Sequence, residues 1–113
     1  LITAIDYDHP DTFPTEQDYK DAFTQFMNQS DHTIMWKTDA EYQGGAPTHS
    51  WVLESVSELS LTGEHNRRNG TLVVKAMEYL AQVPESEVAA ALARFPGTDR
   101  RFEKLADNLY TDY

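Results

Sequence analysis

The sequence LITAIDYDHPD, residues 1–11, begins as an apolar, β-branched run and ends as a dense polar one. A buried strand of a parallel sheet that leads into a functional loop has this form, because such a strand is covered on both faces. The following residues predict a helix, since Thr15 and Asp18 form a near capping box. Its apolar residues repeat at helical spacing, namely Tyr19, Ala22, Phe23, Phe26 and Met27. A strand, a polar loop and a helix in this order are typical of an α/β fold.

Strands and helices are also predicted along the rest of the chain. In order, all predicted elements cover residues 1–5, 15–27, 32–37, 51–61, 66–81, 84–95 and 105–110. The first, third, fourth and last of these are strands, and residues 98–103 are predicted to form a charged turn. The helix over 66–81 has an apolar stripe that is predicted to face inward, namely Leu72, Val73, Ala76, Met77 and Leu80. The order of elements predicts the α/β class.

The composition excludes several functional classes. Of the 113 residues, 40% are hydrophobic and 25% are charged, which suffices for one modest core. Nineteen acidic against nine basic residues give a net charge of -10, which argues against general nucleic-acid binding. No apolar run approaches the roughly 20 residues that cross a bilayer, and without cysteine there are no disulfides or thiolate zinc sites. Because the start has neither Met nor a signal peptide, we expect a piece of a longer protein.

A polar cluster follows the first predicted strand. It offers three carboxylates and one imidazole within six residues, from Asp6, Asp8, His9 and Asp11. Oxygen ligands with one nitrogen suit Mg²⁺ or Mn²⁺, and open α/β sheets bind ligands at the carboxyl ends of their strands. Alternatively, the aspartates cap turns around Pro10 while His9 bonds to the backbone. As a metal site, the pattern favours one protein ligand, His9 or an aspartate, over a full cage.

Two asparagines mark the start of the helix predicted over residues 66–81. Asn66 and Asn69 are three residues apart and therefore lie on the same side of the helix. An amide group donates and accepts hydrogen bonds at once, as the edge of an adenine base requires. Alternatively, the asparagines cap the helix and Asn69 forms a turn with Gly70. Taken alone, the spacing favours capping.

Paired arginines, Arg100 and Arg101, follow a glycine turn in a chain with few basic residues. Guanidinium groups in this arrangement can clamp a phosphate group. Alternatively, they form surface ion pairs with Asp99 or Glu103. The chain contains neither the pattern G-x-x-x-x-G-K-[ST] nor G-x-G-x-x-G. Phosphate chemistry would therefore need its main cradle from sequence outside this chain.

Four segments resemble, in the same order, the motifs of the Mur ligases, in the branch that joins L-alanine to UDP-N-acetylmuramate. Residues 2–13 resemble TNIExDHxDTY, residues 63–70 resemble GxHNxxNA, residues 95–103 resemble FxGxxRRFE, and residues 111–113 resemble the start of DDYxHHP. Ala4, Asp6 and Gly70 stand where this family has Asn, Glu and Ala. The span from His9 to His65 is also shorter than in the family.

The resemblance implies the latter part of a central ATP-binding domain. This domain would be an α/β fold, with an open, mostly parallel three-layer sheet of the P-loop kind that lacks its N-terminal half here. Residues 1–104 would belong to it, and residues 105–113 would form the junction to a C-terminal domain.

The resemblance further implies which residues bind the cofactors. His9 would help to hold Mg²⁺, Arg101 would reach the phosphates of ATP, and Asp112 would bind the ribose hydroxyls. The remaining nucleotide-binding positions would be His65, Asn66 and Asn69. The two asparagines would lie at the adenine, with Asn69 at its polar edge. No catalytic side chain is implied in this stretch.

The implied activity is the ATP-dependent joining of L-alanine to UDP-N-acetylmuramate through an acyl phosphate, in the cytoplasmic synthesis of peptidoglycan precursors. The sugar nucleotide and L-alanine would bind to domains that this chain lacks, so the chain by itself should be inactive. Neither nucleic acid nor a membrane is an expected partner. The alternatives are another Mur-type ligase, such as the one that recycles a tripeptide, and a non-catalytic binding module that keeps the fold.

Overall fold

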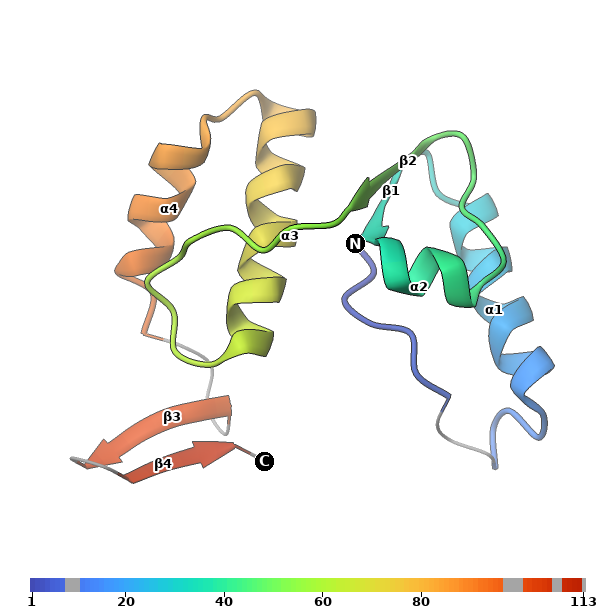
Figure 1. Cartoon of the computed structure of the whole chain (residues 1–113), viewed down its shortest axis with the longest axis horizontal. Coiled ribbons are helices and arrows are strands. Elements are labelled where there is room, and N and C mark those ends of the chain that lie inside the picture. The colour runs from blue at the N-terminus through green and yellow to red at the C-terminus, as the bar shows by residue number, and fades with distance from the viewer. Residues whose placement is uncertain (8–10, 97–100, 107–108, 113) are drawn as a thin grey trace. The chain divides into compact units, whose positions relative to one another are not determined.

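The structure is a computed structural model that describes residues 1–7, 11–96, 101–106 and 109–112, the last two ranges by their backbone alone. The elements, labelled in Figure 1, are α1 (Glu16–Asn28), β1 (Thr33–Trp36), α2 (Lys37–Tyr42), β2 (Ser50–Leu53), α3 (Glu64–Ala81), α4 (Glu85–Ala93), β3 (Arg101–Ala106) and β4 (Leu109–Asp112). The chain divides into an N-terminal unit, Leu1–Ser55, and a C-terminal unit, Val56–Tyr113. Two parallel strands and four helices make this a small α/β fold with an open sheet.

A parallel pair of strands forms the centre of the N-terminal unit. Strand β1 pairs with β2 in a register that runs from Thr33 opposite Ser50 to Trp36 opposite Leu53. The strand predicted over residues 32–37 is confirmed, and all four residues of β1 are buried, as is usual in a parallel sheet. Helix α2 joins the two strands and contacts both. The sequence analysis missed α2, because a polar helix of six residues is too short to show a helical period.

Residues 1–5 do not form the predicted strand, although two of them lie in the core. The segment begins like a strand beside β1, where the Ile2 N–H donates to the Ile34 carbonyl at 3.0 Å. Three residues later the Ile5 N–H donates to the carboxylate of Asp39 at 3.2 Å instead. This side-chain partner replaces a further backbone bond, so no ladder forms. Ile2 and Ile5 are nevertheless buried and join Met35 in the core, as expected of an apolar run.

Helix α1 begins where the capping signal predicts. The hydroxyl of Thr15 accepts from the Asp18 N–H at 3.0 Å, which satisfies one of the free donors of the first turn. Tyr19 and Met27 are buried against the core, whereas the Phe26 side chain is 50% exposed. The predicted apolar stripe is therefore only partly inward.

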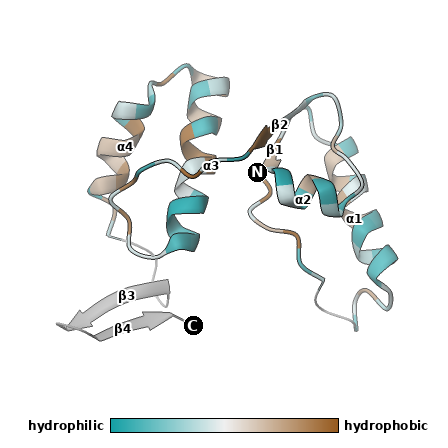
Figure 2. Ribbon diagram, viewed as in Figure 1, coloured by the Kyte–Doolittle hydropathy of each residue, from teal (hydrophilic) through white to brown (hydrophobic). Residues whose placement is uncertain are grey.

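The C-terminal unit contains two helices that pack against each other, α3 and α4. Figure 2 shows the first turns of α3 as hydrophilic and α4 as mostly apolar. The helix predictions for this region are confirmed, but the inward face predicted for α3 is largely wrong. Val73 and Met77 are each 37% exposed and Leu80 is 63% exposed, whereas Val74 is completely buried. The buried face of α3 comprises Gly70, Thr71, Leu72 and Val74.

Residues 56–62 explain this shift of the buried face. The sequence analysis predicts one or two strands over residues 51–61, but the strand ends at Leu53. The chain then runs along α3 without regular structure, where the Ser57 N–H donates to the buried Thr71 hydroxyl at 2.9 Å. Because this loop lies beside Gly70 and Thr71, the face of α3 that carries them is the covered one.

The last two strands form an antiparallel hairpin, in which Arg101 lies opposite Asp112. The charged turn predicted over 98–103 is therefore wrong from Arg101 onward, and the single strand predicted over 105–110 is replaced by the ends of two strands. Within the described part of the chain, no helix is long and apolar enough to cross a membrane.

Candidate functional site

A small pocket lies between α3, α4 and the loop before α3. We call it the α3–α4 pocket, and its volume is about 220 Å³. Its lining residues are Leu61, Asn66, Asn69, Gly70, Val73, Leu92 and Phe95. The four residues from α3 recur at intervals of three and four, so they form one face of the helix. The pocket thus combines apolar walls with two amide side chains.

The two amides of the pocket differ in their hydrogen bonds. The amide nitrogen of Asn66 donates to the Thr62 carbonyl at 2.7 Å and so ties the start of α3 to the preceding loop. Asn69 is exposed, and its amide has no hydrogen-bond partner within the described residues. Asn66 thus uses one donor for a local bond, whereas every donor and acceptor of the Asn69 amide remains available.

Gly70 forms the floor of the pocket. A Cβ atom at this position would lie 2.8 Å from Leu59 Cδ1 and 2.9 Å from Leu61 Cδ1. Both distances are shorter than real Cβ contacts, so any larger residue would push these side chains away. The departure from Ala at this position in the resembling motif thus has a packing reason. The loop lies closer to α3 than a side chain would allow.

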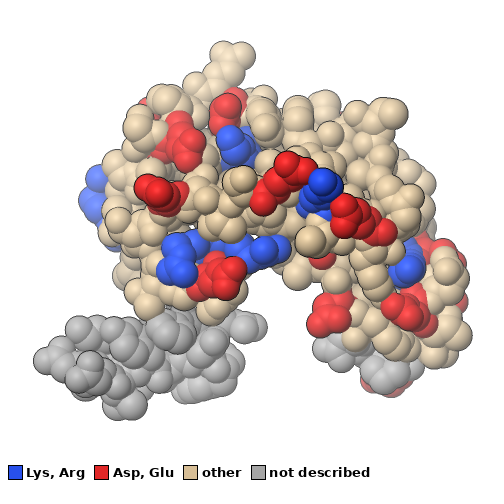
Figure 3. Space-filling model, viewed as in Figure 1, with Lys and Arg blue, Asp and Glu red and all other residues tan. Residues whose placement is uncertain are grey.

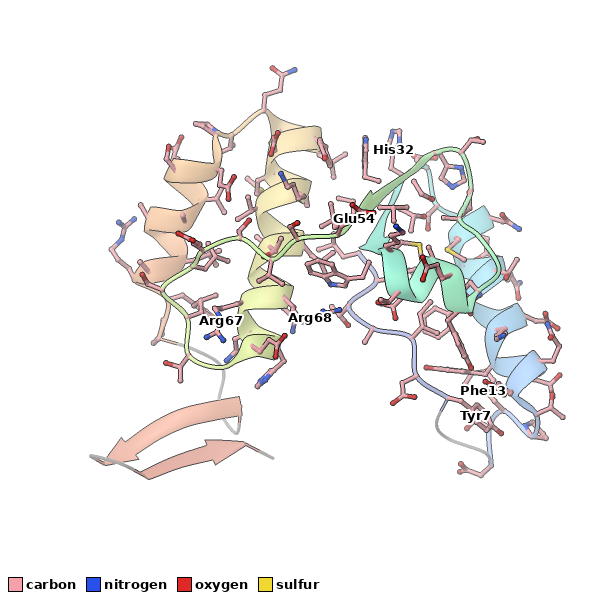
Figure 4. All side chains as sticks on the ribbon, viewed as in Figure 1. Tyr7, Phe13, His32, Glu54, Arg67 and Arg68 are labelled. Atoms are coloured by element: carbon pink, nitrogen blue, oxygen red, sulfur yellow. The ribbon has the colours of Figure 1, made fainter. Side chains whose placement is uncertain are left out.

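Arg67 holds the same loop from the other side. Its guanidinium Nη1 donates to the Leu61 carbonyl at 3.0 Å, and Figure 4 shows it on the first turns of α3 next to Arg68. It also lines an open cavity of about 590 Å³ formed with residues 56–60. Because the bond ends on a wall residue of the α3–α4 pocket, Arg67 helps to fix that wall.

His65 does not line the α3–α4 pocket. Its exposed imidazole lies over Gly63, where a Cβ would be 3.3 Å from the ring. Gly63 has a φ of 91°, a conformation that glycine adopts without strain. The Asn66 amide nitrogen also lies near this position, 3.8 Å from the same Cβ, and the role of His65 at the nucleotide stays a prediction.

Aromatic side chains that contact one another lie before and after the polar segment over residues 8–12 in the sequence. The Tyr7 hydroxyl donates to the Phe13 carbonyl at 2.8 Å, and the Tyr19 ring packs on both of their rings (Figure 4). Asp8 and His9 lie outside the described residues, and Asp6 and Asp11 are exposed. Among the residues that are described, no three potential ligands converge on a metal position. His9 as a Mg²⁺ ligand stays a prediction.

Arg101 and Asp112 are described by their backbone alone. The hairpin register brings them directly opposite each other on β3 and β4. Their predicted roles at the phosphates and the ribose stay predictions.

Charged and polar side chains also pair on the surface of the N-terminal unit. In Figure 3, basic side chains on the visible face lie beside acidic ones. Lys37 and Glu54 are 2.9 Å apart, and this hydrogen bond raises the pKa of Lys37. The Tyr42 hydroxyl donates to Glu16 at 2.5 Å, which raises the pKa of Tyr42 to about 12. Both pairs are on the surface of the N-terminal unit and do not belong to the α3–α4 pocket.

The sequence analysis missed the apolar walls of the pocket as functional residues. Val73 belongs to the inward stripe predicted for residues 66–81, because apolar residues at helical spacing usually form core. Leu92 and Phe95 lie in the helix predicted over residues 84–95, and Phe95 also begins the motif over residues 95–103. Its half-exposed side chain is the signal that separates it from a core residue, and only the structure provides that signal.

Curated relatives align with almost the whole chain. The UDP-N-acetylmuramate--L-alanine ligase of Ligilactobacillus salivarius is 27% identical over 146 residues, which cover 99% of this chain and 33% of the relative. The ligase of the same name from Microcystis aeruginosa is 29% identical and covers 91% of this chain and 28% of the relative. No protein-family model and no solved structure match the chain. Its homologues across most of its length are thus ligases of this kind, and it spans about a third of their length.

The alignment also contains a difference in length. The stretch shared with the Ligilactobacillus salivarius ligase is 146 positions long, whereas this chain has 113 residues. At least 33 positions therefore have no counterpart here. That these positions fall between His9 and His65 stays a prediction.

Proposed function

We propose that this chain forms the adenine-binding part of an ATP-dependent ligase that joins L-alanine to UDP-N-acetylmuramate through an acyl phosphate, in the synthesis of peptidoglycan precursors. The observation that carries the proposal is the α3–α4 pocket, where an unpartnered amide of Asn69 adjoins apolar walls. The similarity to curated ligases of this name supports it.

The shape and chemistry of the pocket suit a purine base. A purine has two apolar faces and a polar edge with donors and acceptors, and a carboxamide satisfies both kinds of group. Pockets for drug-sized ligands measure roughly 300–1,000 Å³. At about 220 Å³, the α3–α4 pocket accommodates a base and leaves the ribose and the phosphates outside.

The other predicted residues complete the proposal. We infer that Arg101 binds the phosphates, that Asp112 binds the ribose and that His9 contributes to a Mg²⁺ site. Bound Mg²⁺ would offset the repulsion between the triphosphate and an anionic carboxylate acceptor. Asn66 and Arg67 support the base pocket through its wall, because their hydrogen bonds hold the loop that forms this wall.

The whole enzyme contains further domains that bind the other substrates. Residues 1–104 belong to a central domain with a mostly parallel three-layer sheet, and residues 105–113 lead to the next domain. UDP-N-acetylmuramate and L-alanine bind through parts that the relatives have beyond the matched third. Because the sugar nucleotide and ATP are cytoplasmic, the reaction takes place there.

A second candidate function is a nucleotide-binding module without ligase activity. At least 33 aligned positions of a relative have no counterpart here, and the sequence lacks a G-x-x-x-x-G-K-[ST] loop. A full-length protein that binds ATP but does not form the amide bond would identify this module.

The test is a titration of the 15N-labelled chain with adenosine and with ATP and Mg²⁺, followed by NMR. We expect weak binding with amide shifts at Asn69, Val73 and Phe95. Asn69→Ala should weaken the binding of adenosine about 2- to 10-fold, because a net hydrogen bond contributes about 0.5–1.5 kcal/mol. Asn28→Ala at the exposed end of α1 is the control and should change nothing. The absence of pocket shifts at millimolar adenosine would refute the proposed function.

A further inference from the structure

We propose that Phe95 stacks on the bound base and thereby supplies most of the affinity of the α3–α4 pocket for the base, whereas Asn69 determines which base is preferred. This inference rests on the proposed function and assigns a role to a residue outside the polar motif. Of the described residues that line the pocket, Phe95 alone is aromatic. The other apolar lining residues, Leu61, Val73 and Leu92, are aliphatic.

The position of Phe95 is fixed by the end of α4. Its N–H donates to the Leu92 carbonyl at 3.0 Å, and the N–H of Arg94 donates to the Ala91 carbonyl at 3.2 Å. Bonds between residues three apart tighten the last turn of a helix. The backbone of Phe95 is therefore fixed next to Leu92, and both side chains line the same pocket.

The ring of Phe95 is available for stacking. Its side chain is 51% exposed, although Phe is a residue type that folding usually buries. Ring contacts in the N-terminal unit join Tyr19 with Phe23 at 5.1 Å and His32 with Trp51 at 4.8 Å. No described ring contacts Phe95. A flat, unpaired and half-exposed ring beside an unpartnered amide is the arrangement that a base requires.

Stacking and hydrogen bonding make different contributions to recognition. Every base has a π face, so the energy of stacking on an aromatic ring depends little on the base and amounts to about 1–3 kcal/mol by alanine substitution. A carboxamide, in contrast, distinguishes bases by their donors and acceptors. Phe95 should therefore strengthen the binding of adenosine and guanosine alike, and Asn69 should separate the two.

The experiment compares three variants of Phe95 by NMR titration of the full chain with adenosine, guanosine and inorganic tripolyphosphate. Phe95→Ala should weaken adenosine and guanosine binding by the same factor, about 5-fold or more. Phe95→Leu, which keeps an apolar side chain without a ring, should lose nearly as much, and Phe95→Tyr should bind like the wild type. Binding of tripolyphosphate should not change. Phe26→Ala is the matched control, since Phe26 is also half exposed but lies in α1.

Ring proton resonances of Phe95 provide a second readout. A base stacked on the ring shifts them upfield, and a merely structural role for Phe95 would leave them unchanged. If adenosine binds the wild type while Phe95→Leu binds it equally well, Phe95 is only an apolar wall and the stacking proposal is wrong. If adenosine does not bind the wild type at all, the proposed function itself fails and the stacking role fails with it. Circular dichroism of each variant confirms that the helices are intact.

Discussion

Replacing Gly70 by alanine sets two opposing effects against each other inside α3. Alanine is a better helix former than glycine by about 0.8–1 kcal/mol, so an open position would gain that stability. At Gly70, however, the new Cβ would lie 2.8 Å from Leu59 Cδ1 and 2.9 Å from Leu61 Cδ1. Overpacking of this kind costs about 1–3 kcal/mol. Because the atoms that must move are the ends of leucine side chains, we expect a net loss of about 0–2 kcal/mol.

The free energy of unfolding is measured by urea denaturation, followed by far-UV circular dichroism. A loss of 1 kcal/mol lowers the urea midpoint by about 0.3–1 M at the slopes usual for small proteins. Leu59→Ala and the double variant with Gly70→Ala complete a mutant cycle. If the close contact is the cause, shortening Leu59 removes part of the penalty and the cycle shows a coupling energy of about 0.5–3 kcal/mol. A stabilisation of about 1 kcal/mol by Gly70→Ala, without coupling to Leu59, would show that helix propensity alone decides and would refute the packing argument.

Two further predictions concern hydrogen bonds outside the pocket floor. Thr71→Val keeps the shape of this completely buried side chain but removes the acceptor of the Ser57 N–H. The free energy of unfolding, measured from the urea midpoint, should therefore fall by about 1 kcal/mol. An unchanged midpoint would mean that this hydrogen bond does not hold the loop on α3. Tyr42 should titrate near pH 12 in ultraviolet absorbance, and Glu16→Gln should lower its pKa. Because the pKa of Tyr42 is raised on folding, the contribution of this bond is fully present below about pH 10 and is lost as the pH rises towards 12. A tyrosinate transition that Glu16→Gln does not move would rule out the bond.

Local signals predicted several elements correctly. Thr15 caps α1, the helical period of α3 and α4 is present in the sequence, and β1 forms where a short β-rich run predicts it. These signals succeed because caps and periodicity act between residues that are close in the chain. The failures have the same origin. The sequence predicts strands over residues 1–5 and 51–61, but the N–H groups of Ile5 and Ser57 donate to the side chains of Asp39 and Thr71, which are distant in sequence.

For the candidate site, too, the sequence predicts the local features and only the structure shows the contacts. The spacing of Asn66 and Asn69 on one helix face follows from the sequence, as does the order of motifs that resembles the Mur ligases. Which of the two amides keeps all its donors and acceptors depends on the Thr62 carbonyl, which accepts from Asn66 and not from Asn69. A pattern of residue types does not contain this choice.

By itself, the sequence determined the three longer helices, the α/β class and the position of the polar motif, because local backbone preferences and spacing encode all three. Only the tertiary structure decided that Val74 and not Val73 is buried, and that Leu61 and Phe95 share a pocket with Asn69. The physical reason is that the loop over residues 56–62 packs on Gly70, a contact made possible by the missing side chain. Glycine at position 70, where the resembling motif has alanine, lets Leu61 approach α3 and so shapes the pocket.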